Sequence, residues 1–258
     1  MSKFFVSPEA IKDNFVDIIG DEANHILRVL RMKIGDELLF CNSRGTDYKG
    51  LISTISEKRV TVEILSSKPC ENEPPIEVIL FQGLPKGDKM EYIIQKCVEL
   101  GVSRIVPVST QFAIAKMGEQ NTETKKLTRW NRISSEAAKQ CGRGVLPEVS
   151  ESMTLTNAIK EAKDYDLVFV PYEQHAQCQE KGFRHLLKKF KNSVVERESS
   201  TRLRIGFFVG PEGGFSTIEL GEFITNDFTP ISLGKRILRT ETASLAVLSI
   251  LMYELGDI

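Results

Sequence analysis

"LRIGFFVGPEGGFSTIELGEF", residues 203–223, runs from an apolar strand pattern through a glycine-rich turn into the start of a helix. Ser216 and Glu219 have the S-x-x-E spacing of a capping box, which places the helix start directly after the turn. The segment therefore predicts a strand-to-helix junction at the carboxyl edge of a sheet, where open α/β sheets bind ligands. A tight turn that needs its glycines only for positive φ is the alternative interpretation.

The turn does not match the usual phosphate-binding motifs. It is neither G-x-G-x-x-G nor G-x-x-x-x-G-K-[ST], so the sequence predicts neither a dinucleotide site nor a P-loop. Glu212 would repel a polyphosphate, whereas its carboxylate suits a ligand with hydroxyl or amino donors, such as a nucleoside. A second strand-to-glycine turn follows in ISLGKRILRTETASL, residues 231–245, where three cations precede a buried helix start: Lys235, Arg236 and Arg239.

Strand and helix patterns alternate from residue 76 onward, which predicts a parallel sheet covered by helices on both faces. The expected strands are IEVILFQ (76–82), RIVPVST (104–110), DLVFVPY (166–172), LRIGFFV (203–209) and TPISLG (229–234). The expected helices are DKMEYIIQKCVELG (88–101), KLTRWNRISSEAAKQC (126–141), LTNAIKEAK (155–163), GFRHLLKKF (182–190), TIELGEF (217–223) and TASLAVLSILMYEL (242–255). The charged segment 191–203 is expected to be a surface loop.

The N-terminal region has a different pattern. DELLF (36–40), KGLISTI (49–55) and RVTVEIL (59–65) are short strand patterns separated by glycines, as in a small β-barrel or sandwich. One or two helical turns are expected within 23–36. The polar, proline-containing stretch 66–78 marks a boundary, so we expect one domain at 1–70 and a second at 75–258.

Composition excludes several classes of protein. The net charge of −1 argues against a protein that coats nucleic acid through bulk charge, although it permits a local basic face. The five cysteines contain no C-x-x-C pair, and the histidines lack metal-ligand spacing, so neither a disulfide framework nor a metal site is expected. No leader pattern and no run of about 18 apolar residues is found, so we expect a cytoplasmic protein that does not span a membrane.

The terminal helix pattern is apolar on nearly every side, which is typical of a helix buried on two faces. Packing within the domain and packing at a subunit interface both account for this pattern. The sequence leaves the two alternatives open.

The motifs GPEGGFS (210–216) and SLGKRILRTETA (232–243) resemble those of the small-subunit ribosomal RNA uridine-N3 methyltransferase family, which belongs to the knotted SPOUT superfamily. Three further segments resemble the same family in the same order: HILRVLRMKIGDEL (25–38), QGLPKGDKMEYIIQKCVELGV (82–102) and RWNRISSEAAKQCGRG (129–144). The resemblance covers the whole chain, except that segment 191–203 is longer than the family leads us to expect.

The resemblance implies a PUA-like or OB-like N-terminal barrel that binds RNA and an α/β methyltransferase domain with a C-terminal trefoil knot, which is a rare topology. It also implies a homodimer and S-adenosylmethionine as cofactor. Matched residue by residue, the cofactor-binding positions are Val170, Pro171, Val209, Gly210, Pro211, Glu212, Gly213, Leu233, Gly234, Ile237, Leu238 and Arg239.

Methylation at N3 of uridine requires loss of the imide proton, after which negative charge spreads over O2 and O4. Arg239 and Arg236 are the expected stabilisers of that anion, with Arg143 as a third, supplied by the partner subunit. Glu241 or Glu212 is the expected base, although Glu241 also fits a carboxylate that favours the N-terminus of a helix. Cys141 is expected to be a small packing residue, because a deprotonated N3 needs no covalent adduct.

The implied substrate is a uridine in the decoding region of 16S rRNA within the small ribosomal subunit. The residues expected to contact RNA are Arg28, Arg31, Lys33, Lys86, Lys89, Arg129, Arg132, Lys139 and Arg143. Two alternatives remain: a Rossmann-type nucleotide-dependent enzyme, and a non-catalytic RNA-binding or ribosome-assembly protein.

Overall fold

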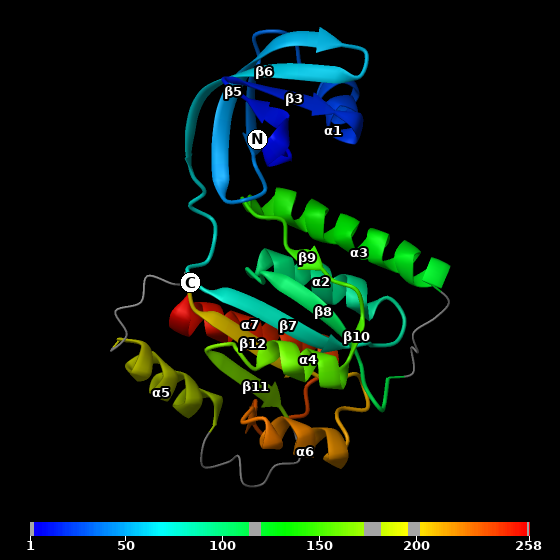
Figure 1. Cartoon of the computed structure of the whole chain (residues 1–258), viewed down its shortest axis with the longest axis vertical. Coiled ribbons are helices and arrows are strands. Elements are labelled where there is room, and N and C mark those ends of the chain that lie inside the picture. Colours follow the sequence, from blue (N-terminus) through cyan, green and yellow to red (C-terminus); the bar gives the residue numbers. More distant parts are fainter. Residues whose placement is uncertain (1–2, 114–119, 173–181, 196–201, 257) are drawn as a thin grey trace. The chain divides into compact units, whose positions relative to one another are not determined.

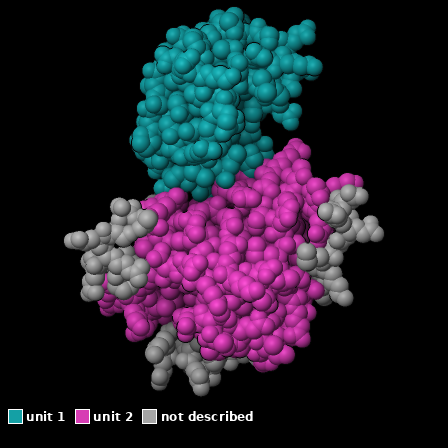
Figure 2. Space-filling view, in the orientation of Figure 1, with its two compact units in different colours: residues 1–73, 135–146 teal, residues 74–134, 147–258 magenta. Residues whose placement is uncertain are grey.

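A computed structural model describes residues 3–113, 120–172, 182–195, 202–256 and 258. The chain divides into two compact units, which we describe separately (Figure 2). Unit 1 comprises Met1–Glu73 and Ser135–Leu146, and unit 2 comprises Pro74–Ser134 and Pro147–Ile258. The inclusion of 135–146 in unit 1 is not visible in the sequence, because helical periodicity does not tell which core the end of a helix joins.

Unit 1 contains a six-stranded curved sheet in the order β1-β4-β5-β6-β3-β2 (Figure 1). Its strands are β1 (Lys3–Phe5), β2 (Ile11–Lys12), β3 (Phe15–Ile19), β4 (Glu37–Cys41), β5 (Thr46–Ser56) and β6 (Arg59–Pro69). β1 pairs with β4 in parallel, and the other pairs are antiparallel. The three strands expected from the sequence are confirmed as β4, β5 and β6.

β3 was not expected, because its sequence hides the two-residue period of a strand. Val16 and Ile18 point into the core, while the apolar Phe15 and Ile19 are exposed. Helical residues follow β3 in α1 (Gly20–Asn24) and η2 (His25–Val29), and η1 (Pro8–Ala10) precedes β2. Unit 1 has its own core, in which Phe40 and Ile26 are fully buried.

Unit 2 contains a parallel sheet in the order β10-β8-β7-β12-β11-β13, with β9 also paired to β8. The strands are β7 (Glu77–Gly83), β8 (Arg104–Ser109), β9 (Glu148–Val149), β10 (Met153–Thr154), β11 (Leu167–Pro171), β12 (Arg204–Val209) and β13 (Thr229–Ile231). All five expected strands are present. The predicted parallel sheet is therefore confirmed.

Helices cover both faces of this sheet (Figure 1). On one face, α4 (Leu155–Ala162) and α6 (Thr217–Thr225) pack over an aromatic cluster that includes Phe81, Phe208 and Phe223. On the other, α7 (Thr240–Leu255) packs against α2 (Lys89–Glu99) and β12, and Phe183 of α5 (Phe183–Val195) contacts Phe169. α3 (Gln120–Cys141) runs from unit 2 into unit 1 along the chain.

Two expectations about helices have definite outcomes. The segment 191–203 was expected to be a loop, but α5 continues to Val195; residues 196–201 lie outside the described residues. α7 is buried within unit 2 along Val247, Leu248 and Leu251.

Candidate active site

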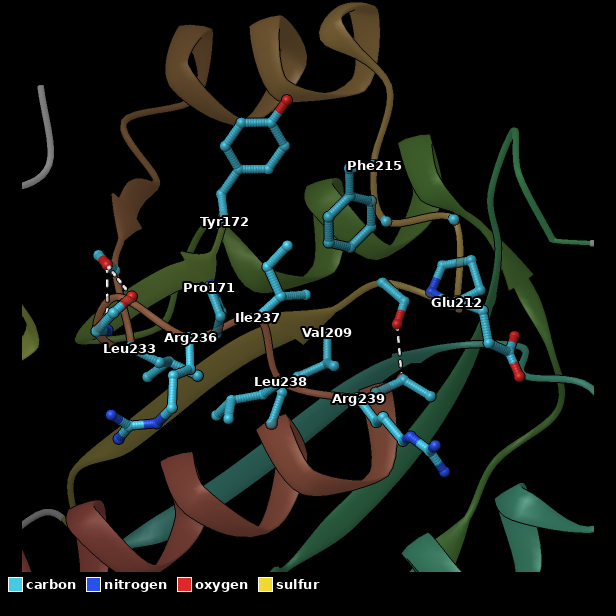
Figure 3. Close-up of a pocket in the computed structure, with 18 of the residues that line it drawn as sticks. Pro171, Tyr172, Val209, Glu212, Phe215, Leu233, Arg236, Ile237, Leu238 and Arg239 are labelled. Atoms are coloured by element: carbon cyan, nitrogen blue, oxygen red, sulfur yellow. Dashed lines mark hydrogen bonds between the residues drawn. The ribbon is translucent and has the colours of Figure 1, made fainter. Parts of the chain in front are cut away.

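A cavity of about 360 Å³ lies at the carboxyl ends of three adjacent strands, β11, β12 and β13 (Figure 3). Its walls come from the end of β11, the glycine turn after β12 and the segment that joins β13 to α7. The lining residues are Lys89, Pro171, Tyr172, Val209, Gly210, Pro211, Glu212, Gly213, Gly214, Phe215, Ser232, Leu233, Gly234, Arg236, Ile237, Leu238, Arg239, Thr240 and Ala243.

The glycines of the turn after β12 are required mainly by the close approach of neighbouring atoms, from the backbone at Gly210 and from a side chain at Gly213. Only Gly214 has a positive φ, of 68°. A Cβ atom on Gly210 would lie 2.9 Å from the backbone of Gly214, and one on Gly213 would lie 2.8 Å from Cβ of Phe112. The interpretation as a turn with glycines for positive φ alone is therefore insufficient.

The predicted capping box at the start of α6 is confirmed. The backbone N–H of Glu219 donates to Oγ of Ser216 at 3.3 Å, and the N–H of Ser216 donates to the Glu219 carboxylate at 2.8 Å. The same carboxylate accepts from the backbone N–H of Gln111 at 2.7 Å. Glu219 thus ties the helix start after β12 to the segment after β8.

A buried polar network joins β7, β12 and α7 beneath the cavity. Nε2 of Gln82 donates to Oγ1 of Thr240 at 2.9 Å, and that hydroxyl donates to the carbonyl of Gly210 at 2.7 Å. Oγ of Ser244 donates to Oε1 of Gln82 at 2.7 Å. Because Gln82 and Ser244 are fully buried, these bonds strongly favour one arrangement of the three elements.

Glu212 is held in an ion pair at the rim of the cavity. Its carboxylate accepts from Nζ of Lys89 at 2.6 Å and from the backbone N–H of Lys86 at 3.2 Å. Partial burial acts to raise the pKa of Glu212, but the bonds from Lys89 and the backbone outweigh it, and the pKa is lowered. A carboxylate with a lowered pKa is a weak base, which argues against Glu212 as the proton acceptor.

The segment between β13 and α7 carries the two expected catalytic arginines. The chain changes direction after β13, where the N–H of Gly234 donates to Oγ of Ser232 and Gly234 has a φ of 110°. Arg236 and Arg239 are exposed, and neither makes an ion pair with any of the described residues. Figure 3 shows their guanidinium groups extending in different directions from the segment, so they do not converge on one point.

Most expected cofactor positions line this cavity, but Val170 does not. Val170 is fully buried in the core beneath α4 and α6, because alternate side chains of β11 point to opposite faces. Glu241, expected as a base, lies in the first turn of α7 outside the lining, and its Oε2 is buried without a hydrogen-bond partner among the described residues.

The sequence did not single out several lining residues. These are Tyr172, Gly214, Phe215, Ser232, Thr240 and Ala243. Each lies one to a few positions from an expected residue, so widening the motif along the chain would have found them. Gln82 is different, because only its polar side chain within an apolar strand pattern marks it.

The residues expected to contact RNA differ in accessibility. Arg28, Arg31 and Lys33 of unit 1 and Lys86, Arg129 and Arg132 of unit 2 are exposed. Lys89 is paired with Glu212, and Lys139 with Glu22. Arg143 is only 3% exposed and donates to the Glu73 carboxylate through Nε and Nη2, so its guanidinium serves the packing of unit 1 and is not available to RNA or to a reacting base.

Other predicted features are reported for the described residues only. They contain no group of three or more histidine, cysteine, aspartate or glutamate residues placed to hold a metal ion. Cys41, Cys70, Cys97 and Cys141 are free thiols, and Cys178 lies outside the described residues. No helix in this part of the chain is long and apolar enough to cross a membrane.

Comparison with family models gives two matches. Residues 72–252 match the model of an RNA methyltransferase domain, and residues 18–65 match the model of an RNA methyltransferase PUA domain. The first match spans most of unit 2 and contains the whole lining of the cavity.

Named relatives are similar along almost the whole chain. The ribosomal RNA small subunit methyltransferase E of Bacillus subtilis (strain 168) is 34% identical over 92% of this chain and 89% of its own length. The protein of the same name from Synechocystis sp. is 30% identical over 96% of this chain and 76% of its own.

Two solved structures of methyltransferases are also similar along almost the whole chain. The structure of a ribosomal RNA small subunit methyltransferase E from Neisseria gonorrhoeae bound to S-adenosyl methionine is 28% identical, with a TM-score of 0.82 and coverage of 100% of this chain and 99% of that one. A putative methyltransferase of Legionella pneumophila with bound cofactor SAM has the same TM-score at 29% identity, over 99% of this chain and 98% of its own.

Proposed function

The chain belongs to the ribosomal RNA small subunit methyltransferase E family, and we propose that it transfers a methyl group from S-adenosylmethionine to N3 of a uridine in 16S rRNA of the small ribosomal subunit. The cavity at the ends of β11, β12 and β13 is the observation that carries this proposal, because expected cofactor positions from three separate segments meet there. We place the reaction in the cytoplasm, where small subunits are assembled.

The cavity fits S-adenosylmethionine by size and chemistry. Its volume is within the roughly 300–1,000 Å³ range of small-molecule sites. Leu233, Ile237 and Leu238 supply apolar surface for an adenine ring, while the glycine turn brings backbone polar groups to the wall. When bound, the cofactor supplies an electrophilic methyl group on a sulfonium.

Arg239 is the residue to which we assign stabilisation of the uridine anion. Its guanidinium is exposed at the cavity and unpaired among the described residues, so it is available to O2 or O4 of the base. Arg236 extends in another direction (Figure 3), which suits a contact with RNA phosphate or with the cofactor's carboxylate. A preorganised cation placed where charge develops accelerates the reaction without reorganisation.

Proton removal from N3 is assigned to solvent. Glu212 is weakened as a base by Lys89, and Glu241 lies outside the cavity lining. We assign Glu241 the alternative role, in which a carboxylate in the first turn of α7 interacts favourably with the helix dipole.

A trefoil knot in the C-terminal region is part of this proposal. β13 lies at the sheet edge beside β11, yet α7 packs against β12 and α2, nearer the middle of the sheet. The segment 232–239 therefore returns past the end of β11 to the turn after β12, where Thr240 bonds to Gly210. Such a return supports a threaded connection.

We also propose that the protein is a homodimer that binds RNA through exposed cations on each unit. α7 leaves Ile250 and Tyr253 38% and 69% exposed, which is apolar surface suited to a second copy. The proposed RNA contacts are Arg28, Arg31, Lys33, Lys86 and Arg132, with Lys89, Arg129 and Lys139 contributing if their ion pairs open. Tyr253→Glu should convert the dimer to a monomer in sedimentation analysis.

The proposed reaction is tested by transfer of labelled methyl groups to small subunits from cells that lack this gene, followed by nucleoside analysis. We expect 3-methyluridine with the wild type, and a fall in kcat of roughly 100- to 1,000-fold with Arg239→Ala. Lys235→Ala is the matched control, because Lys235 is an exposed neighbour outside the cavity lining. Cofactor binding without transfer to subunits or rRNA would contradict the reaction.

A further inference from the structure

A second cavity, of about 520 Å³, lies in unit 2 between the N-terminal part of α2, one face of α3 and the segment 150–152. Its residues from α3 are Glu123, Leu127 and Trp130, together with Thr124, Lys126 and Arg129. The spacing of the first three places them on one face of the helix. This cavity is larger than the one assigned to the cofactor, and no step of the proposed reaction uses it.

The walls of this cavity are braced from two sides. The Asn131 side chain donates to the Val149 carbonyl at 2.8 Å and accepts from the Val149 N–H at 3.0 Å, which fixes the strand before Ser150 against α3. Nη2 of Arg129 donates to Glu91 at 2.7 Å, which joins α3 to α2. The cavity is therefore formed in advance and does not depend on a ligand to bring its walls together.

Trp130 supplies an aromatic surface to this cavity. It is the single tryptophan of the chain, it is half-buried, and it shares the lining of the cavity with the apolar residues Leu84, Pro85 and Met90. An aromatic side chain in an open, preformed cavity can stack on a flat ligand, and stacking of bases on aromatic side chains is the usual way proteins hold unpaired nucleotides.

The polar groups of the cavity are mainly hydrogen-bond acceptors. Oγ of Ser150 is shielded from solvent and has no hydrogen-bond partner among the described residues, which is a state that buried hydroxyls rarely keep. Arg129 is paired with Glu91, and the other charged residues of the lining are three carboxylates, Asp88, Glu123 and Glu151, and one cation, Lys126, none with an ion pair among the described residues. Three carboxylates outweigh the single unpaired lysine, so the set accepts hydrogen bonds from amino groups and disfavours phosphate, and it selects the base of a nucleotide rather than its backbone.

The cavity shares a wall with the cofactor cavity. Asp88 and Met90 line the second cavity, and Lys89 between them lines the first, where it is paired with Glu212. A nucleotide in the second cavity would therefore lie against the start of α2, next to Lys89, which borders the proposed methyl-transfer site. That separation suits a base near the target uridine in the same RNA strand.

We propose that this second cavity binds an unpaired base of the RNA substrate that carries an exocyclic amino group, stacked on Trp130. Adenine, cytosine and guanine have such an amino group, whereas uracil offers a single N–H donor and two carbonyl acceptors. The proposal rests on the proposed function for the nature of the RNA. It adds a site that selects the sequence around the target.

Trp130 allows a direct test, because its fluorescence is the only tryptophan signal of the chain. Short oligoadenylate, oligocytidylate and oligouridylate of equal length are titrated at one salt concentration. Saturable quenching by the adenine and cytosine oligomers, with weaker quenching by the uracil oligomer, is expected. Equal quenching by all three, or quenching that rises linearly without saturation, would overturn the proposal.

Variants connect the cavity to the reaction. Stacking on an aromatic side chain corresponds to roughly 5- to 150-fold in affinity, so Trp130→Ala should raise KM for small subunits by that factor while kcat and cofactor affinity stay unchanged. Trp130→Phe, which keeps an aromatic ring and the packing, should retain most of the affinity. A fall in kcat with unchanged KM would overturn the proposal, because a merely structural tryptophan acts that way.

Glu151→Gln provides a second variant that does not disturb the core, since Glu151 is exposed. It should reduce the preference for the adenine and cytosine oligomers over the uracil oligomer, and Glu148→Gln, an exposed carboxylate of β9 outside the cavity, should not. If selective quenching persists but no methyl transfer is found, the proposed function fails and this site stands. Transfer without selective quenching overturns this site alone.

Discussion

The hydroxyl of Thr240 joins three parts of the chain that are distant in sequence. It accepts from Gln82 in β7 and donates to Gly210 after β12, while its own residue begins α7. The bond from Gln82 is buried and the bond to Gly210 is partly buried, so a missing partner leaves a polar group with little access to water. The geometry of the proposed cofactor cavity therefore depends on one hydroxyl that bonds to the framework of the site.

Thr240→Val keeps the shape of the side chain and removes this hydroxyl. Nε2 of Gln82 then keeps only its backbone acceptors, of which the carbonyl of Gly83 lies at 2.9 Å, and the carbonyl of Gly210 loses the donor at 2.7 Å, so the free energy of unfolding should fall by about 1–3 kcal/mol. Cofactor affinity should fall as well, because the glycine turn loses its link to α7. Urea denaturation and calorimetric titration measure both effects, and Thr240→Ser, which retains the hydroxyl, should behave as the wild type. Unchanged stability in Thr240→Val would contradict the role of the network.

Glu212→Gln tests the ion pair with Lys89 through its pH dependence. The folded-state pKa of Glu212 lies below its ordinary value of 4.5, so the pair stabilises the protein above that pH and its contribution is lost as the pH falls through the folded pKa. At pH 7 the variant should be less stable by up to about 1 kcal/mol, since the pair is partly exposed.

The difference between Glu212→Gln and the wild type should shrink as the pH falls below 4.5. Denaturation series at several pH values measure this, and Lys89→Met should give the same pH-dependent loss because it removes the partner. A stability difference that stays constant down to acidic pH would show that the carboxylate charge is not responsible.

At the scale of elements, the turn after β12 explains what sequence reasoning reached and what it missed. The strand, the turn and the capping box of α6 were predicted correctly, because each has a local pattern. The reason for the glycines was not predictable, since it lies in contacts with distant residues. A Cβ atom on Gly83, at the end of β7, would lie 2.6 Å from Cδ of Pro211 in that turn.

Gly83→Ala should therefore displace the glycine turn. Overpacking of this kind destabilises by about 1–3 kcal/mol, and cofactor affinity should fall with it. Gly221→Ala is the matched control, because Gly221 lies in the middle of α6 and a Cβ atom there meets nothing within 4 Å. That variant should gain up to about 1 kcal/mol, since alanine favours helix more than glycine does. Thermal denaturation separates the two, and equal effects would contradict the contact argument.

At the scale of the whole molecule, the alternation of strands and helices in unit 2 followed from the sequence, because buried parallel strands and their covering helices have distinct patterns. Which segments of the chain make up unit 1 could not be predicted from the sequence. Residues 135–146 complete it through Arg143 with Glu73 and through Nζ of Lys3, which donates to the carbonyl of Gly142 at 2.8 Å. These are single long-range contacts with no periodic pattern.

The sharing of α3 predicts that the two units unfold together. α3 belongs to unit 2 up to Ser134 and to unit 1 from Ser135 onward, so loss of unit 2 removes the support of a segment that unit 1 needs. Cys41 of unit 1 and Cys97 of unit 2 are fully buried and report on each unit. Burial raises the pKa of Cys41 to about 12 and raises that of Cys97 further, so neither thiol reacts without opening of the structure.

S-adenosylmethionine at about 100 times its Kd should slow labelling of Cys97 by about 100-fold, because a ligand that binds only the folded state lowers the open population by that factor. Coupling through α3 means that Cys41 should be protected to a similar extent, although no residue of the proposed cofactor cavity lies in unit 1. Mass spectrometry of the labelled peptides measures both rates, with NAD as the control ligand that should protect neither. Protection of Cys97 alone would mean that the units open independently and that α3 does not couple them.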